Sequence, residues 1–361
     1  MAIKNIFGFD QFAERLNSNA APTSATIQQW FTEEGYPLTF EAAYTSYAEA
    51  ANYSIINFRG RNWFGQNYQM PTTSHRLHNR LYATLGTLYG AETPKTKWYG
   101  GIRYYKDTIN FTGSVCMIRI CGVEVAPINT TPNGEHYLEW CIDWTTNKLT
   151  IWLDDAYVID YNVAFTIGHL FEFGRMNGPY WNNQGPLYFT DLYFLVDSGD
   201  NIASKRLGPI KVSAVPLDEA TVPAGWTKSS TVLTPPDNYS AKDILNNKLA
   251  GTNTNYLNNG MLSATSSAPG QFSLAEPPIV SDEILYVQVR ATMLRDAASS
   301  DKAVTKVSGG GVDRAEVTTV LSNTYKDQLL GEFHKKDDGS TFKPADIGQI
   351  GISIKSVPSG A

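Results

Sequence analysis

The histidines are the first residues to consider for catalysis or metal binding, because imidazole is both a general base near neutral pH and a common metal ligand. The chain has five: His75, His78, His136, His169 and His334. His75 and His78 are three residues apart, whereas a helical zinc site needs two histidines four apart with a glutamate between them. The neighbouring arginines Arg76 and Arg80 also disfavour a cation. The histidines therefore predict neither a zinc site nor a catalytic triad.

A pair of carboxylates would indicate a glycoside hydrolase, whose two mechanisms place the carboxyl groups about 5 to 9 Å apart. Glu139 and Asp143 point the same way from one predicted strand, but the strand rise separates them by about 13 Å. The chain also lacks a Gly-x-Ser-x-Gly nucleophile turn and a phosphate-binding loop that ends in Lys-Ser or Lys-Thr. We therefore predict that the protein is not an enzyme and needs no cofactor. A glycosidase is the weakest of our three functional hypotheses.

Aromatic rings beside amides and glycines are the strongest binding candidates, because such rings suit a sugar face or a flat protein partner. Three segments have this composition, 61–68, 98–101 and 178–184. Their six candidate ligand-binding residues are Trp63, Tyr68, Trp98, Tyr99, Tyr180 and Trp181. The alternative is that these rings pack at the ends of a sandwich core.

The segment 197–201 gathers the oxygen ligands that Ca²⁺ prefers. Asp197 and Asp200 are weak metal candidates on this basis. The same composition is also favoured in ordinary type I turns, so we predict no metal site.

Alternating hydrophobicity predicts the strands that position these residues. Leu138, Trp140, Ile142 and Trp144 share one face of a strand, and a polar turn at 145–148 leads into a second alternating run that ends at Asp154 and Asp155. This pattern predicts an antiparallel hairpin. Further strands of the first half are predicted at 115–121, 157–161, 187–196 and 207–215, and short helices at 26–34 and 40–51.

The 361 residues suffice for two domains. The strand pattern breaks near Pro216, and a proline-rich stretch follows, which cannot continue a ladder. We therefore predict one domain at 1–216 and a second at 217–361. Strands of the second domain are predicted at 284–294, 317–321, 328–334 and 350–355. The fold class is all-β, with a second, smaller β-sandwich after the first.

Charge and hydropathy exclude several partners. The net charge is -6, whereas a nucleic-acid-binding protein would present a basic patch. No apolar stretch approaches the about 20 residues that cross a bilayer, and the first residues lack the apolar region of a secretory signal. Three cysteines, Cys116, Cys121 and Cys141, are expected to be buried thiols. We expect no nucleic-acid partner, no membrane insertion and no signal peptide.

The predicted hairpin resembles the concanavalin A-like and laminin-G-like pattern, in which a strand of the form Glu-Trp-x-x-Asp precedes a turn and a strand that ends in Asp-Asp or Asp-Gly. Here Glu139, Trp140 and Asp143 match the first strand, and Asp154 and Asp155 end the second. Together with three further segments, the chain resembles bacteriophage virion proteins that contain this jelly roll. Those segments are 8–12, 190–197 and 207–212. The second half is similar to theirs at 225–226, 236–239, 286–291, 295–296 and 321–325.

The resemblance implies a concanavalin A-like jelly-roll sandwich followed by a smaller β-sandwich domain, in a non-enzymatic structural component of a bacteriophage particle. Such a protein is made in the host cytoplasm and resides in the virion, as a part of the tail, baseplate, neck or capsid surface. Its expected partners are other virion proteins and further copies of itself. The alternative is a carbohydrate-binding, lectin-like module that recognises a host-surface glycan. Residues 33–69 do not match the family pattern and could hold an attachment site or an oligomer contact.

Overall fold

The computed structural model describes most of the chain in segments: residues 2–9, 28–29, 31–32, 35–44, 53–58, 61–66, 77–93, 95–106, 114–125, 132–177, 187–197, 206–224, 226–230, 233–246, 256–258, 268–277, 284–295, 302–323 and 326–357. The chain divides into two compact units. The first comprises Met1–Thr32 and Tyr36–Ser213, and the second comprises Glu33–Gly35 and Ala214–Ala361. Each unit is described by itself.

The larger sheet of the first unit has eight strands. Its order is β11-β10-β9-β6-β13-β4-β3, and β1 also pairs with β13. The strands are β1 (Ala2–Phe7), β3 (Tyr53–Phe58), β4 (Arg61–Gln66), β6 (Lys97–Lys106), β9 (Gly134–Asp143), β10 (Lys148–Leu153), β11 (Ala156–Asn162) and β13 (Leu187–Val196). All of their pairings are antiparallel. The predicted hairpin at Tyr137–Asp155 is present as β9 and β10.

The smaller sheet of the first unit has five strands in the order β2-β5-β12-β7-β8. They are β2 (Thr39–Tyr44), β5 (Leu77–Thr84), β7 (Ser114–Ile120), β8 (Val123–Glu124) and β12 (Leu170–Asn177). A short helix, α2 (Leu85–Tyr89), follows β5, and the Thr84 side chain caps it by accepting a hydrogen bond from the Thr87 amide.

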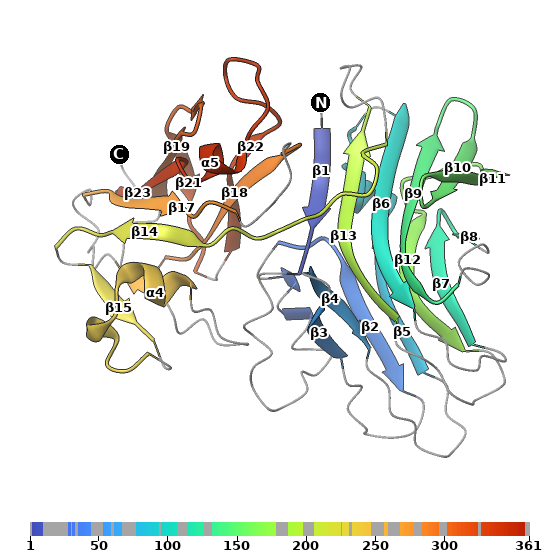
Figure 1. Ribbon diagram of the computed structural model, residues 1–361, viewed down its shortest axis with the longest axis horizontal. Helices are drawn as coiled ribbons and strands as arrows, with labels where there is room; N and C mark the ends of the chain where they lie inside the picture. The colour runs from blue at the N-terminus through green and yellow to red at the C-terminus, as the bar shows by residue number, and fades with distance from the viewer. Residues whose placement is uncertain are drawn as a thin grey trace. The chain divides into compact units, whose positions relative to one another are not determined.

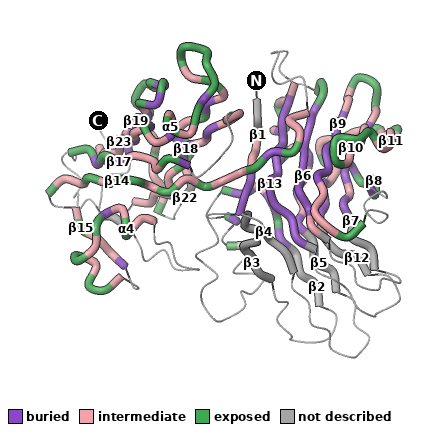
Figure 2. Tube along the Cα trace, viewed as in Figure 1, coloured by how far each residue is buried: buried purple, intermediate pink, exposed green. Residues whose placement is uncertain are grey.

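The two sheets of the first unit lie face to face (Figure 1), and aromatic side chains pack between them. Trp140 of β9 stacks on Phe171 of β12 with ring centroids 5.3 Å apart. The ring centroids of Phe189 of β13 and Phe173 of β12 are 4.1 Å apart. Buried residues are dense along the central strands β6, β9 and β13, as Figure 2 shows. The prediction of an all-β sandwich is confirmed.

One glycine makes this packing possible. Gly100 on β6 lies directly opposite Trp140 on β9, and a Cβ built on Gly100 would lie 2.2 Å from the indole ring. Only a residue without a side chain lets the ring lie flat on the neighbouring strand. The indole nitrogen then donates to the Tyr89 hydroxyl at 3.0 Å, which in turn donates to the Tyr99 carbonyl.

The second unit contains a six-stranded sheet in the order β14-β17-β23-β19-β20, with β21 also paired to β19. Two pairs of strands, β18 with β22 and β15 with β16, are separate from it. The strands are β14 (Leu217–Thr221), β15 (Thr227–Ser229), β16 (Tyr256–Asn258), β17 (Gly270–Leu274), β18 (Val287–Met293), β19 (Lys302–Gly309), β20 (Val312–Asp313), β21 (Val317–Val320), β22 (Lys326–Phe333) and β23 (Gly351–Val357). The short helices are η2 (Pro236–Asn238), α4 (Ala241–Asn246) and α5 (Pro344–Ile347).

The core of the second unit lies between the six-stranded sheet and the β18–β22 pair. Phe272, Val307 and Ile352 come from the sheet, and Val289 and Phe333 come from the pair. These side chains belong to one buried apolar cluster. The second unit is therefore also built from packed β layers.

Two sequence-based assignments were wrong. Residues 207–215 were expected to form a strand, but they pair with no other strand and follow an irregular path. Side chains of the larger sheet bind their backbone instead. A helix was expected at 40–51, but residues 40–44 belong to β2, and 45–51 lie outside the described residues. In the other expected helix, at 26–34, the described residues 28–29 and 31–32 are helical.

The two cysteines whose side chains are described, Cys121 and Cys141, are buried free thiols. Burial raises the pKa of both, so they are unreactive thiols that pack as small apolar groups. Among the described residues, none of the helices combines the length and the apolar character that spanning a bilayer requires.

Candidate functional site

The outer side of the larger sheet carries charged and tyrosine side chains where the inner side carries aromatic and aliphatic ones. Arg103 lies opposite Tyr137, and Gly101 lies opposite both Glu139 and Tyr193. Residues directly opposite one another in a sheet share a face. Because Trp140 and Phe194 contact Phe171 of the smaller sheet, the residues that alternate with them point to the outside.

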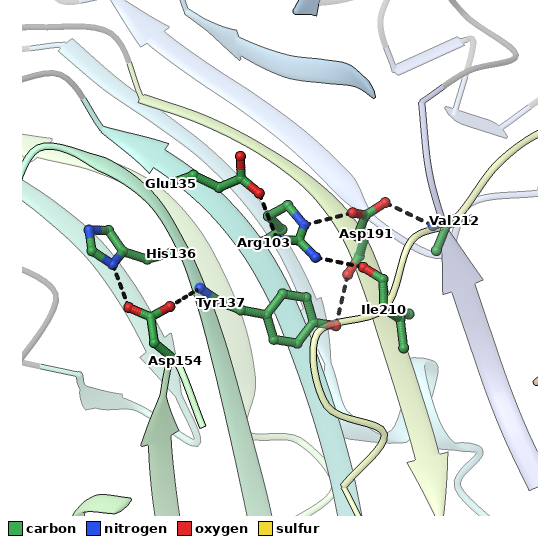
Figure 3. Close-up of polar contacts among 8 residues, drawn as sticks. All are labelled: Arg103, Glu135, His136, Tyr137, Asp154, Asp191, Ile210 and Val212. Carbon is green, nitrogen blue, oxygen red and sulfur yellow. Dashed lines mark hydrogen bonds and ion pairs between the residues drawn. The ribbon is translucent and has the colours of Figure 1, made fainter. Parts of the chain in front are cut away.

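Arg103 is the centre of this outer cluster (Figure 3). Its Nε donates to Asp191 Oδ2 at 2.8 Å, its Nη1 to Glu135 Oε1 at 2.7 Å and its Nη2 to the Ile210 carbonyl at 2.8 Å. Its guanidinium also lies over the Tyr137 ring, 4.9 Å from the centroid. Every nitrogen of the guanidinium therefore donates a hydrogen bond, which a buried cation requires.

Asp191 is fully buried, with 0% of the residue exposed. It lies at a register shift in β13 and has a φ of 51°, in the left-handed region that Asp tolerates better than most residues. Its Oδ2 accepts from Arg103, and its Oδ1 accepts from the Val212 amide at 2.9 Å. Its carbonyl accepts from the Tyr137 hydroxyl at 3.4 Å. The irregular backbone thus aims a carboxylate at a segment beyond the strand.

Glu139 is a second buried carboxylate on the same face. Its Oε1 accepts from the Tyr193 hydroxyl at 2.6 Å and from the Gly208 amide at 3.0 Å, and its Oε2 accepts from Arg206 at 2.8 Å. Burial raises the pKa of Glu139, while the Tyr193 hydroxyl and Arg206 oppose that rise. A raised pKa in a carboxylic acid is a common mark of an active site, but structural networks produce it too.

These charged groups hold residues 206–212, which we call the strap. The Leu207 amide donates to the Tyr193 hydroxyl at 3.2 Å. Together with the bonds of Gly208, Ile210 and Val212 described above, this fixes the strap backbone at four residues. The strap is thus bound by side chains of the sheet and not by a backbone ladder, which is why it does not form a strand.

Arg206 fastens the beginning of the strap. Besides Glu139, its Nη1 contacts Asp155 Oδ1 at 3.2 Å, and its guanidinium lies over the Trp152 ring, 4.7 Å from the centroid. At the other end, Val212 packs against Gly8, where an added Cβ would lie 3.0 Å from the Val212 carbonyl oxygen. The strap therefore has anchors at both ends and along its length.

A histidine and an aspartate lie beside the cluster and meet it only at the Tyr137 backbone (Figure 3). His136 Nδ1 and Asp154 Oδ2 are 2.7 Å apart, and His136 Nε2 lies 3.0 Å from the Pro132 carbonyl. Asp154 Oδ1 accepts from the Tyr137 amide at 2.8 Å. The pair thus fixes the start of β9 to the end of β10, which is a structural task.

The cluster can bind a peptide backbone, and its groups are already used for that purpose. All four carboxylate oxygens of Asp191 and Glu139 accept hydrogen bonds from the strap or from residues of the sheet. A general acid or nucleophile would need an oxygen free for substrate. Within the described part of the chain, no group of three or more His, Cys, Asp or Glu side chains is placed to hold a metal ion.

Of the residues proposed from sequence as ligand contacts, Trp98 and Tyr99 have described side chains. Trp98 and Tyr99 are buried, and Trp98 stacks on Tyr89 with centroids 4.7 Å apart. Their burial favours the packing alternative for these two rings. Trp63 belongs to β4, of which only the backbone is described. Tyr68, Tyr180 and Trp181 lie outside the described residues.

Of the two weak metal candidates, Asp197 is among the described residues and Asp200 is not. Asp197 follows β13, where its amide donates to the Lys97 carbonyl at 2.8 Å and its carbonyl accepts from the Thr96 hydroxyl at 3.2 Å. Asp200 lies outside the described residues.

Sequence reasoning missed Arg103, Asp191 and Arg206. A usable signal existed for the first two, because each is a charged residue inside a long, mostly apolar strand. Buried strands rarely accept a charge unless it is paired. Arg206 carries no comparable signal, since it precedes an irregular segment.

No protein-family model and no curated protein sequence matches this chain. Solved structures with a similar chain path include lectin I from Ulex europaeus in complex with the methyl glycoside of alpha-L-fucose, which is 12% identical, covers 45% of this chain and 93% of its own, and has a TM-score of 0.28. Arcelin-5, a lectin-like defence protein from Phaseolus vulgaris, is 7% identical; the match covers 44% of this chain and 91% of arcelin-5, with a TM-score of 0.26. The binding domain of botulinum neurotoxin serotype D/C is 7% identical; the match covers 89% of this chain and 90% of that domain, with a TM-score of 0.29.

Similarity at these TM-scores carries no argument about function. The assignment of an all-β sandwich follows from the strand pairing and the aromatic contacts between the sheets. The outer cluster is best described as a strap anchorage.

Proposed function

We propose that this chain is a non-enzymatic structural component of a bacteriophage particle, in the tail, baseplate, neck or capsid surface. One observation carries the proposal. The four segments of the first unit that resemble phage virion proteins meet at the strap anchorage. Glu139 of the hairpin binds Gly208, Asp191 binds Val212, and Gly8 packs on Val212.

This convergence supports the resemblance because the matching residues are the ones that fix the architecture. A chance match of separate short segments would not be expected to bring them into mutual contact. The role of the contacts also fits a building block, since they hold a segment in place and leave no carboxylate oxygen of Asp191 or Glu139 without a donor.

The proposal predicts that the chain is physically part of the particle. Phage that encode this chain would be purified through two successive density gradients, and their proteins quantified by peptide mass spectrometry. We expect its peptides to keep a constant ratio to those of the major capsid protein through both gradients. The matched control is a phage-encoded enzyme of the infected cell, whose ratio should fall at each step. Peptides that fall in parallel with the enzyme would contradict the proposal.

Glycan recognition stays an untested alternative function. It rests on Trp63, Tyr68, Tyr180 and Trp181 after Trp98 and Tyr99 are assigned to the core. It is compatible with a place in the particle, because a virion protein can also contact the host surface.

A further inference from the structure

Strand β21 forms one edge of the six-stranded sheet in the second unit. It pairs with β19 from Val317 opposite Thr305 to Val320 opposite Lys302. Among the described residues, no strand pairs with its other side. Within the described part of the chain, the backbone N–H and C=O groups on that side therefore have no strand partner, and such an edge can pair with another extended chain.

The side chains of β21 do nothing to prevent such pairing. Val317 is 51% exposed and Val320 is 68% exposed, and the strand between them consists of two threonines. These residue types have high strand propensity, and the strand contains no charge and no proline. Soluble proteins normally protect an edge with charges, prolines or bulges.

The opposite edge of the same sheet has this protection. There β14 carries Asp218 and Glu219, and both are exposed. The two edges of one sheet thus differ, and only β21 has the composition of a pairing surface.

We propose that the free edge of β21 pairs antiparallel with the same edge of a second copy of this chain. A second copy is the occupant because the edge is complementary to itself. An antiparallel pair of identical strands has a two-fold axis perpendicular to the sheet, so the contact closes as a dimer and does not propagate. The inference does not depend on a place in a phage particle, since it concerns only copies of this chain.

Side-chain complementarity selects the register. With Thr319 on the two-fold axis, Val317 lies opposite Leu321 of the second copy, and Thr318 lies opposite Val320. Apolar side chains then meet at both ends, and Glu316 faces Ser322 and not its own counterpart. With Thr318 on the axis, Glu316 would lie opposite Val320, which buries a carboxylate against an apolar side chain. The first register is therefore the favoured one.

The first test is a charge in the middle of the proposed contact. In Val320→Lys, the new ammonium must leave water or break the contact, and because Val320 is exposed the fold should tolerate it. We expect sedimentation velocity over a concentration series to show a monomer–dimer equilibrium for the wild type and a dimer dissociation constant raised about tenfold or more in the variant. The matched control is Tyr157→Lys, which places the same charge at a 61% exposed residue on β11, an edge strand of the first unit. It should leave the dimer unchanged.

The second test fixes the register. Thr319→Cys should give a disulfide-linked dimer under mild oxidation, because the residue on the axis lies next to its own copy. Thr318→Cys should not, since its neighbour is Val320. The wild type, whose three cysteines all precede residue 142, provides the background. A wild type that stays monomeric throughout the series, or crosslinking at 318 and not at 319, would overturn the proposal.

Discussion

Replacing Asp191 with alanine is expected to lower the free energy of unfolding of the first unit by about 3 to 5 kcal/mol, the usual cost of removing one member of a buried ion pair. The substitution leaves the Arg103 guanidinium buried with Glu135 as its remaining carboxylate partner, and it deprives the Val212 amide of its acceptor. Urea unfolding followed by far-ultraviolet circular dichroism measures the loss.

Two further variants separate the causes of that loss. Asp191→Asn keeps an oxygen acceptor and tolerates the left-handed backbone, so it should fall between the wild type and the alanine variant. Asn147→Ala has the same kind of backbone, with a φ of 52°, at an exposed turn. It measures the cost of left-handed backbone alone, about 1 to 2 kcal/mol. If Asp191→Ala costs no more than Asn147→Ala, the carboxylate does not hold the strap.

The second large effect concerns the contact between Gly100 and Trp140. Trp140→Ala should cost about 3 to 5 kcal/mol, because it empties the space between the two sheets. Gly100→Ala should cost about 1 to 3 kcal/mol, because the new methyl group overlaps the indole ring. In the double variant the ring is absent, so the methyl group has room and the cost of Gly100→Ala should nearly vanish.

A double-mutant cycle in urea measures this coupling. The control is Gly168→Ala, whose added Cβ would have Thr166 Oγ1 at 3.9 Å as its nearest contact. That substitution should change stability little in either background. Additive costs for Gly100→Ala and Trp140→Ala would mean that the indole does not lie on β6.

The sequence predicted the strands well where one face is apolar and the other is not. The hairpin of β9 and β10 is an example, because Leu138, Trp140 and Ile142 are all buried on the inner side. It failed at residues 207–215, where apolar residues such as Ile210 and Val212 suggested a strand although Gly208 and Pro209 interrupt the alternation. The residue types of an extended segment do not say whether backbone or side-chain groups satisfy its hydrogen bonds.

The strap anchorage could not have been predicted from local sequence. Arg103 and Asp191 are 88 residues apart, and Glu139 and Tyr193 are 54 residues apart. Their pairing follows from the strand order β9-β6-β13, which places β6 between two strands distant in sequence. Local sequence also could not show that Trp98 and Tyr99 are buried. A ring beside glycines has the same local pattern in a binding loop and in a core strand.

Hydrogen exchange of the strap amides is the most direct test of the claim that a buried charged cluster binds this segment. The amides of Leu207, Gly208 and Val212 donate to Tyr193, Glu139 and Asp191. In the intact wild-type chain we expect them to exchange as slowly as the amides of β6 and β9, although the strap belongs to no sheet. In Asp191→Asn, the Val212 amide should exchange faster. Strap amides that exchange at the rates of an unstructured peptide while β6 and β9 stay protected would contradict the account.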